Sequence, residues 1–176
     1  MREAAEAIVR RCHAVALTGA GISVPSGIPD FRSPGGIWEK FDPMEYATID
    51  AFLRDPAKVW EFFVELDELL LGAEPNPAHE ALARLEAIGL LDGVITQNVD
   101  NLHRQAGSKI VVEFHGSGRQ LICPGCGGRR YPEPDMQIPP VCSCGQAMKP
   151  DVVLFGEPPR SAPWKRRRSW RGDPGS

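Results

Sequence analysis

Residues 15–32 read VALTGAGISVPSGIPDFR, and this stretch decides the fold. Its first residues, 15–17, are apolar and predict a short strand, and a glycine-rich turn at 19–21 follows. Such a turn after a parallel strand lets backbone N–H groups approach a diphosphate, while the N-terminus of the following helix faces the anion. The pattern predicts a phosphate-binding turn, although Gly-x-Gly alone fits an ordinary tight turn equally well.

The dinucleotide fingerprint of common dehydrogenases is incomplete in this chain. It requires Gly or Ala three residues after its second glycine, and here Val24 follows Gly21 at that spacing. No acidic residue ends a credible second strand to bind a ribose. A dehydrogenase is therefore disfavoured, whereas the continuation through Asp30, Phe31 and Arg32 is a more specific signal than the glycines alone.

Helical and strand patterns alternate along the chain. Helices are predicted over 2–13, from Asp55-Pro56 to near Gly72, and from Asn76-Pro77 to Gly89, because a capping residue with a proline begins a helix and a glycine ends it. Further strands are predicted over the apolar runs 93–96, 109–114 and 152–155, and a long loop over 24–50. This alternation is typical of an α/β fold with a doubly wound, parallel, Rossmann-like sheet.

Composition and charge are those of a globular protein. The chain has 176 residues, is 42% hydrophobic and 24% charged, and has a formal net charge of −3, which suits one domain with a small insert. Residues 160–176 hold six Lys or Arg and one Asp, but no aromatic-rich sheet or recognition helix accompanies them, so nucleic-acid binding is not expected. Because there is no secretory leader and no apolar run of membrane-spanning length, we expect a cytoplasmic protein without a membrane partner.

Four of the five cysteines form two close pairs, Cys123 with Cys126 and Cys142 with Cys144, separated by fifteen residues. Close thiolate pairs suit tetrahedral Zn²⁺, and four of them complete its coordination, so we expect one structural zinc ion. A disulfide framework is the alternative, but it fits poorly in a chain without an export signal. Cys12 is expected to pack as a small residue on the first helix.

Polar residues follow two of the predicted strands, at the edge where ligands bind in open α/β sheets. Gln97, Asn98 and Asp100 follow the strand at 93–96, and their side chains suit a ribose or a carboxamide, with helix capping by Asn98 or Asp100 as the alternative. His115 follows the next strand, and a histidine there can act as a general base. The remaining histidines lack such a context and are expected at helix surfaces or in packing: His13, His79 and His103.

Together these motifs resemble those of the sirtuins, a family of NAD-dependent protein lysine deacylases. The matching segments keep the family's order and are GAGISVPSGIPDFRSPGGIW (19–38), TQNVDNLH (96–103), FHG (114–116), the four cysteines and KPDVVLFGE (149–157). The likeness is closest to the bacterial and archaeal-type deacetylases. It implies NAD as co-substrate, a structural zinc ion, and a protein or peptide with acetylated lysine as partner.

The resemblance also implies roles for individual residues. The NAD-binding set is Gly19, Ala20, Gly21, Asp30, Phe31, Arg32, Gln97, Asn98 and Asp100. His115 matches the catalytic base, and the four cysteines match the zinc ligands. The segment matched to the strand edge on which acetyl-lysine peptides pair by β-augmentation contains Val153, Phe155, Gly156 and Glu157.

The activity implied is removal of acetyl groups from protein lysine side chains, with nicotinamide and O-acetyl-ADP-ribose as products. A mono-ADP-ribosyltransferase and a catalytically weak, zinc-stabilised fragment that binds acetylated peptides are the alternatives. Desuccinylating sirtuins resemble this chain but carry Tyr and Arg where Phe63 and Leu66 stand here. A negatively charged acyl group would be buried without a cation, so acetyl or longer neutral acyl groups are expected.

Four parts are predicted along the chain: the first part of a Rossmann-like NAD-binding domain over 1–120, a zinc-binding module over 121–148, a return strand to the Rossmann-like domain over 149–157, and an atypical basic tail over 158–176. Sirtuins continue after the last matching segment with two parallel strands that hold the adenosine half of NAD. Here the composition changes abruptly at Pro158. This predicts a sheet incomplete in its C-terminal half and a truncated or frameshifted tail, with a natural short form as the alternative.

Overall fold

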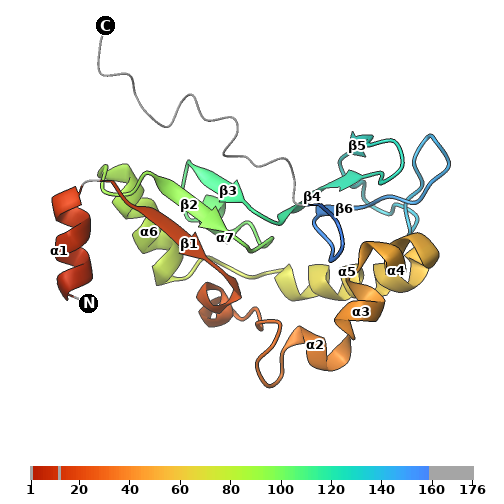
Figure 1. Cartoon of the computed structure of the whole chain (residues 1–176), viewed down its shortest axis with the longest axis horizontal. Coiled ribbons are helices and arrows are strands. Elements are labelled where there is room, and N and C mark those ends of the chain that lie inside the picture. The colour runs from red at the N-terminus through yellow and green to blue at the C-terminus, as the bar shows by residue number, and fades with distance from the viewer. Residues whose placement is uncertain (1, 12, 159–176) are drawn as a thin grey trace, which may run out of the picture.

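The computed structural model describes residues 2–11 and 13–158, so the predictions for Cys12 and for the tail from 159 onward lie outside the described residues. Figure 1 shows an elongated molecule with a different sheet at each end. In Figure 1, α6 (Pro77–Ala87) lies alongside the parallel sheet, α1 (Arg2–Arg11) stands at the far left beyond the start of β1, and α5 (Pro56–Leu70) lies beside the antiparallel sheet. Within the described residues, no helix is both long enough and apolar enough to cross a membrane.

The parallel sheet has the strand order β1-β2-β3, with β1 at Val15–Thr18, β2 at Gly93–Thr96 and β3 at Val111–Glu113. Val15 pairs with Gly93, and Val94 pairs with Val111. A short helix, α7 (Leu102–Gln105), follows β2 and packs against α6. The prediction of a parallel, Rossmann-like sheet is confirmed, and all its strands run so that their carboxyl ends meet at one edge.

The two long helices begin and end where the sequence predicted. The Asp55 side chain accepts a hydrogen bond from the backbone N–H of Lys58 at 3.1 Å, and Asn76 accepts one from Ala78 at 2.9 Å. Gly72 and Gly89 follow these helices with φ angles of +79° and +77°. A glycine adopts this left-handed conformation without steric cost, so the capping signals fixed both helices locally.

The loop predicted over 24–50 is wrong, because short helices divide it: η2 (Val24–Ser26), α2 (Ile37–Lys40), α3 (Pro43–Tyr46) and α4 (Ile49–Arg54). The Asp42 and Thr48 side chains cap α3 and α4. Aromatic side chains hold these turns against α5, since Trp38 stacks on Phe62 with ring centroids 5.6 Å apart. Such short helices contain too few residues to show a hydrophobic period, and tertiary packing stabilises them.

The antiparallel sheet has the strand order β5-β4-β6, with β4 at Gly116–Ile122, β5 at Arg129–Arg130 and β6 at Lys149–Val152. The strand predicted over 152–155 therefore ends at Val152 and pairs with β4 rather than with the parallel sheet. The residues after it leave the strand because their backbone bonds go elsewhere: the N–H of Val153 donates to the carbonyl of His115 at 2.8 Å.

The main hydrophobic core lies at the end of the molecule that carries the antiparallel sheet. Trp60 of α5 donates its indole N–H to the carbonyl of Met148 at 2.8 Å, which joins this helix to the start of β6. The buried members of the cluster are Ile37, Phe41, Ala47, Ala51, Phe52, Val59, Trp60, Phe62, Phe63, Leu121, Cys123, Met148, Val152 and Leu154.

Candidate functional site

The glycine-rich turn lies at the carboxyl ends of β1 and β2. Asn98 donates its side-chain N–H to the carbonyl of Gly19 at 3.2 Å, and a Cβ added to Gly19 would lie 3.7 Å from Gln97 Nε2. Ala20 and Gly21 continue into η1 (Ala20–Ile22), a single 3₁₀ turn. The structure therefore brings the turn and the amides together, and backbone and amide groups line this edge.

Asn98 and Asp100 meet at Ser23, a residue that the sequence analysis did not select. The Ser23 hydroxyl is buried, donates to Asp100 Oδ2 at 2.6 Å and accepts from Asn98 Nδ2 at 3.1 Å. The other Asp100 oxygen accepts the backbone N–H of Leu102 at 2.9 Å. Asp100 thus caps the turn at the start of α7 and also joins the loop after β2 to the loop that contains Ser23. Its partner Ser23 lies 77 residues away, which no local signal reveals.

Two histidines lie beneath this edge, and both are fully buried. His79 Nε2 is 3.5 Å from the Ser23 hydroxyl, and His103 Nε2 is 2.9 Å from the Thr18 hydroxyl. Their rings contact each other with centroids 4.8 Å apart. Burial lowers the pKa of His79. The pKa of His103 is also lowered, mainly by burial and to a smaller extent by the charge of the neighbouring His79. The histidines therefore pack, as predicted, but they do so within a polar cluster and not at helix surfaces.

Asp30, Phe31 and Arg32 form a separate turn. The Asp30 carboxylate accepts the Ser33 hydroxyl at 2.6 Å and the backbone N–H groups of Ser33 and Arg32 at 2.7 and 3.1 Å. These bonds, the Ser33 hydroxyl first, lower the pKa of Asp30. Phe31 packs on Trp38 at 5.0 Å, while Arg32 is exposed. The hydrogen bonds of the Asp30 carboxylate stay within its own turn, so a share of this turn in the same site as Gly19 and Asn98 remains a prediction.

His115 lies in the turn between β3 and β4. Its Nδ1 is 3.0 Å from the carbonyl of Gln97. A carbonyl only accepts hydrogen bonds, so Nδ1 carries the proton in this arrangement and Nε2 has the free lone pair. An ion pair spans the turn, since Arg119 Nη2 lies 2.8 Å from Glu113 Oε2. His115 is thus oriented by the same loop that carries Gln97 and Asn98.

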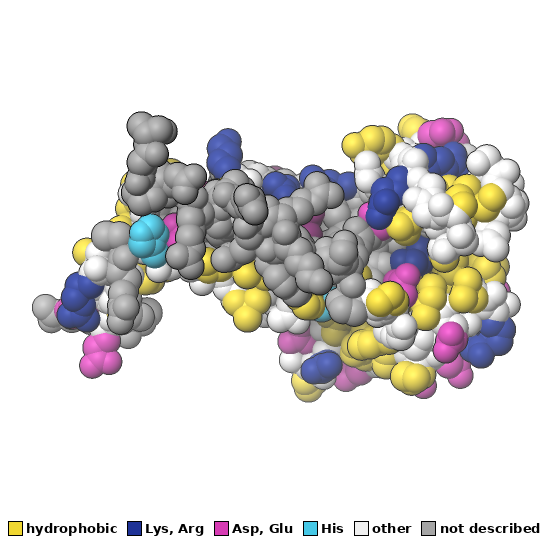
Figure 2. Space-filling view, turned by 45° about the horizontal axis from the view of Figure 1, so that its top comes forward, with side chains coloured by type: hydrophobic (Ala, Val, Ile, Leu, Met, Phe, Trp, Pro, Cys, Tyr) yellow, Lys and Arg dark blue, Asp and Glu magenta, His cyan; other side chains and the backbone are white. Residues whose placement is uncertain are grey.

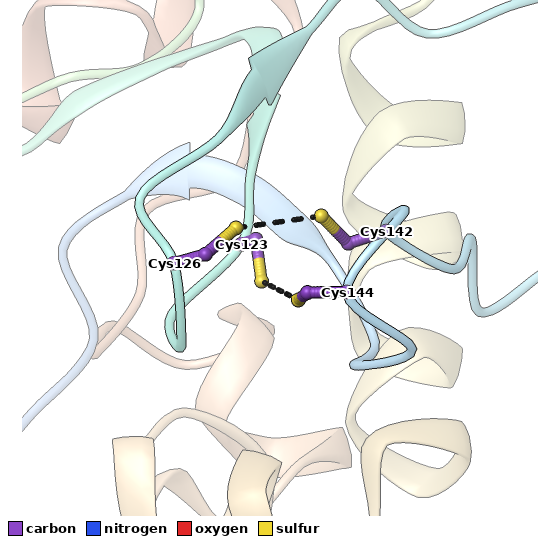
Figure 3. A group of neighbouring side chains, drawn as sticks. All are labelled: Cys123, Cys126, Cys142 and Cys144. Atoms are coloured by element: carbon purple, nitrogen blue, oxygen red, sulfur yellow. Dashed lines mark hydrogen bonds between the residues drawn. The ribbon is translucent and has the colours of Figure 1, made fainter.

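The four cysteines converge from two loops of the antiparallel end (Figure 3). All four sulfur atoms lie within 4.8 Å of one another, and the Cys123–Cys144 and Cys126–Cys142 distances are both 3.5 Å. Bonds of about 2.3 Å from Zn²⁺ to four tetrahedral thiolates would place the sulfurs roughly 3.8 Å apart. The backbone N–H of Cys144, followed by the Cys126 thiol, lowers the pKa of Cys142 to about 6. The donor set therefore fits one zinc ion.

The segment from Val153 to Glu157 follows β6 and contacts the short helices. Phe155 donates its N–H to the carbonyl of Ala47 and accepts the N–H of Ile49, each at 2.9 Å. Both backbone groups of Phe155 are thus already paired, and a peptide strand would have to use other groups, such as those of Gly156. Phe155 as a whole residue is 52% exposed, so it is available to an approaching partner.

A parallel Rossmann-like sheet with a glycine-rich turn and an inserted four-cysteine metal site defines a narrow class of α/β proteins. A family model described as "Sir2 family" matches residues 19–169. The chain belongs to this family.

Curated relatives agree with this membership. An NAD-dependent protein deacylase 2 of Pyrobaculum aerophilum is 50% identical over 155 residues, covering 87% of this chain and 62% of the relative. An NAD-dependent protein deacylase of Aeropyrum pernix is 51% identical, covering 89% of this chain and 64% of the relative. The chain thus spans a little under two thirds of the length of these relatives.

Solved structures share the fold. A Sir2 homologue in complex with NAD aligns with a TM-score of 0.74 at 45% identity, covering 84% of this chain and 59% of the other. A Sir2 variant with a deacetylated p53 peptide and 3′-O-acetyl-ADP-ribose aligns with a TM-score of 0.76 at 42% identity, covering 83% of this chain and 61% of the other.

Proposed function

We propose that this chain carries the site of an NAD-dependent protein lysine deacetylase, which releases nicotinamide and forms O-acetyl-ADP-ribose. The observation that carries the proposal is the hydrogen bond of His115 Nδ1 to the Gln97 carbonyl. This bond leaves the lone pair of Nε2 free, at the edge of the sheet where the glycine turn meets Asn98. The names of the relatives, which span more than this chain, support the same reaction.

The donor groups at this edge suit the nicotinamide-ribose and diphosphate end of NAD. We assign this binding to the backbone of the turn at 19–21, to Gln97 and Asn98, and to Asp100, which Ser23 orients. Asp30, Phe31 and Arg32 would cover the bound molecule. When bound, NAD supplies the ribose carbon that loses nicotinamide and receives the acetyl oxygen. Because the acetyl group passes to ADP-ribose, the reaction is a group transfer.

His115 would act as the general base. Since its Nδ1–H is held by a carbonyl, Nε2 accepts a proton from a ribose hydroxyl that then attacks the acetyl carbon. The bond to Gln97 fixes both the tautomer and the ring orientation. The zinc ion would take no part in the chemistry, because four cysteine sulfurs leave it no open position.

The acetylated peptide would approach along the segment that contains Val153, Phe155, Gly156 and Glu157. The N–H of Val153 donates to the carbonyl of His115 at 2.8 Å, so the segment proposed to bind the peptide is attached directly to the residue proposed as the base.

We also propose a cytoplasmic location. Support comes from the four cysteines, which form no disulfide with one another and converge as a zinc site instead, as suits a reducing compartment.

Product analysis with NAD labelled in its ADP-ribose part tests this proposal. The zinc-loaded chain is incubated with a peptide that carries one acetyl-lysine, and we expect deacetylated peptide, nicotinamide and labelled O-acetyl-ADP-ribose in equal amounts. His115→Ala should abolish turnover, whereas the matched control His13→Ala, at an exposed histidine beside Asp92, should not. Label on the protein would favour ADP-ribosyl transfer, and peptide binding without NAD consumption would favour a binding fragment.

A further inference from the structure

Lys149, at the start of β6, is a buried cation. Its side chain is 2% exposed, and its ammonium lies 2.9 Å from Glu157 Oε2 and also donates to the carbonyl of Val152. Lysine is almost never fully buried unless it is paired, because the desolvated charge is costly. The pair therefore joins the first residue of β6 to the end of the segment that follows this strand.

Glu157 also bonds within that segment. The oxygen that faces Lys149 accepts the backbone N–H of Leu154 at 2.7 Å, and the N–H of Glu157 donates to the carbonyl of Leu154 at 3.1 Å. A single carboxylate thus closes residues 154–157 into a turn. At Gly156 the φ angle is +84°, and an added Cβ would lie 3.3 Å from Ile49 Cγ2, so the turn also fits closely against α4.

The turn is attached on both sides to elements of the proposed site. Val153 bonds to the backbone of His115, and Phe155 bonds to Ala47 and Ile49. These contacts fix the ends of the segment, while the Lys149–Glu157 pair fixes its curvature. Buried ion pairs add little net stability compared with apolar residues of the same volume, and their best attested use is to select one arrangement. A positional role therefore fits the chemistry better than a purely stabilising one.

We infer that the Lys149–Glu157 ion pair is a positioning device that holds residues 153–156 in the conformation that receives the acyl-lysine peptide. The inference rests on the proposed function, and it changes the part played by Glu157. This residue was predicted to contact the peptide, but its carboxylate is directed to Lys149 and to Leu154. Glu157 is thus a positioning residue, and Val153, Phe155 and Gly156 remain to face the substrate.

Peptide binding to the zinc-loaded full chain tests the inference. The probe is a fluorescent peptide with one acetyl-lysine, and its unacetylated form is the reference. Lys149→Met keeps the length of the side chain but removes its charge, and we expect it to weaken peptide binding about tenfold or more. Lys149→Arg should stay within about threefold of the unchanged chain, because it keeps the cation. Hydrogen exchange should quicken over residues 153–157 in Lys149→Met and leave the cysteine loops unchanged.

The matched control removes an exposed pair of the same chemistry. Lys58 Nζ lies 2.6 Å from Glu45 Oε2 on the surface, and Lys58→Met should bind the peptide within about twofold of the unchanged chain. Loss of the zinc ion would reveal that Lys149→Met fails to fold. In that case peptide binding is measured with Glu157→Asp instead. This variant keeps the charge but withdraws the carboxylate from Leu154, and it should weaken binding about threefold to tenfold.

Each outcome either supports or overturns the inference. Folded Lys149→Met that binds the peptide as tightly as the unchanged chain would show that the pair only stabilises the fold. Failure of Lys149→Met to fold together with unaltered binding by Glu157→Asp would overturn it as well. An unchanged chain that does not distinguish acetylated from unacetylated peptide would contradict the proposed function itself, and the substrate role of this segment with it.

Discussion

The end of the molecule that carries the cysteines buries aromatic and aliphatic side chains, whereas the end that carries the parallel sheet buries many polar ones. Fourteen buried residues, among them Phe52, Trp60 and Phe62, form the hydrophobic cluster of the first end. In the second end Ser23, His79 and His103 are no more than 1% exposed, and Leu17 of β1 is 71% exposed. In Figure 2, the surface of the end that carries the cysteines shows groups of hydrophobic side chains with charged side chains between them.

This difference indicates that one end of the molecule stabilises the fold and the other end forms the proposed site. An apolar core with a metal site supports a fixed shape without help from a ligand. In a buried polar cluster every group without a partner lowers stability, so the cluster favours one arrangement and is sensitive to small changes. In this chain the sensitive cluster lies directly beneath the proposed NAD-binding edge. We therefore expect perturbations of the first end to unfold the protein and perturbations of the second to alter the site.

Loss of a zinc ligand has the largest expected effect. Cys123 is fully buried within the hydrophobic cluster, so Cys123→Ser should reduce bound zinc from one ion per chain to much less and abolish exchange protection in β4–β6. Metal analysis and hydrogen exchange measure both. Ser143→Ala, at an exposed residue between Cys142 and Cys144 in the other cysteine loop, is the control and should keep the metal. Full protection without zinc would contradict a structural role for the ion.

A cavity in the aromatic cluster comes next. Phe62 is 4% exposed and contacts Trp38, Phe41 and Phe63, so Phe62→Ala should lower the free energy of unfolding by about 3–5 kcal/mol. The comparison variant Leu17→Ala, on the exposed face of β1, should change it by less than about 0.5 kcal/mol. Denaturant titration of both variants measures the difference between their free energies of unfolding. Similar losses in the two variants would mean that both ends belong to one core.

A smaller loss is expected from the polar cluster. Thr18→Val preserves shape but removes the hydroxyl that meets His103 Nε2, and His103 Nδ1 already has no hydrogen-bond partner among the described residues. An unsatisfied buried nitrogen costs about 1–3 kcal/mol. Denaturant titration should find this loss, and the variant Thr18→Ser should recover most of it. A free energy of unfolding unaffected by Thr18→Val would show that the contact between Thr18 and His103 does not stabilise the fold.

The pH dependence should be the mildest of these effects. Burial lowers the pKa of His79 and of His103 below the ordinary value of 6.5. The unfolded chain therefore binds more protons than the folded one once the pH falls below about 6.5, so stability is full above that pH and decreases as the pH falls toward the lowered values. The free energy of unfolding, measured from about pH 7.5 to about pH 5, where histidine titrates, should show this dependence on pH. The double variant His79→Asn/His103→Gln should have a weaker dependence.

The sequence was most informative where local chemistry decides the structure. Asp55-Pro56 and Asn76-Pro77 cap their helices as predicted, and the cysteine spacing located a cluster that the fold brings within 4.8 Å. These signals are contained in a few neighbouring residues, so they can be interpreted without the tertiary structure.

The sequence was least informative where distant partners decide. Ser23 and Asp100 are 77 residues apart, and Thr18 and His103 are 85 apart. Asn76 gave one usable signal, because His79 follows it at the spacing of a capping box and its ring nitrogen does accept the Asn76 N–H. β6 pairs with β4 in the antiparallel sheet, and the Lys149–Glu157 ion pair holds the residues that follow it. The pattern of apolar residues in the sequence cannot reveal either contact.

Hydrogen exchange of the zinc-loaded chain with and without NAD tests the central claim most directly. We expect NAD to increase protection at residues 19–36 and 97–103, where the glycine turn, the Asp30 turn and the amides lie, and to leave the cysteine loops at 121–148 unchanged. Protection gained only at the cysteine loops, or no change anywhere at saturating NAD, would contradict it.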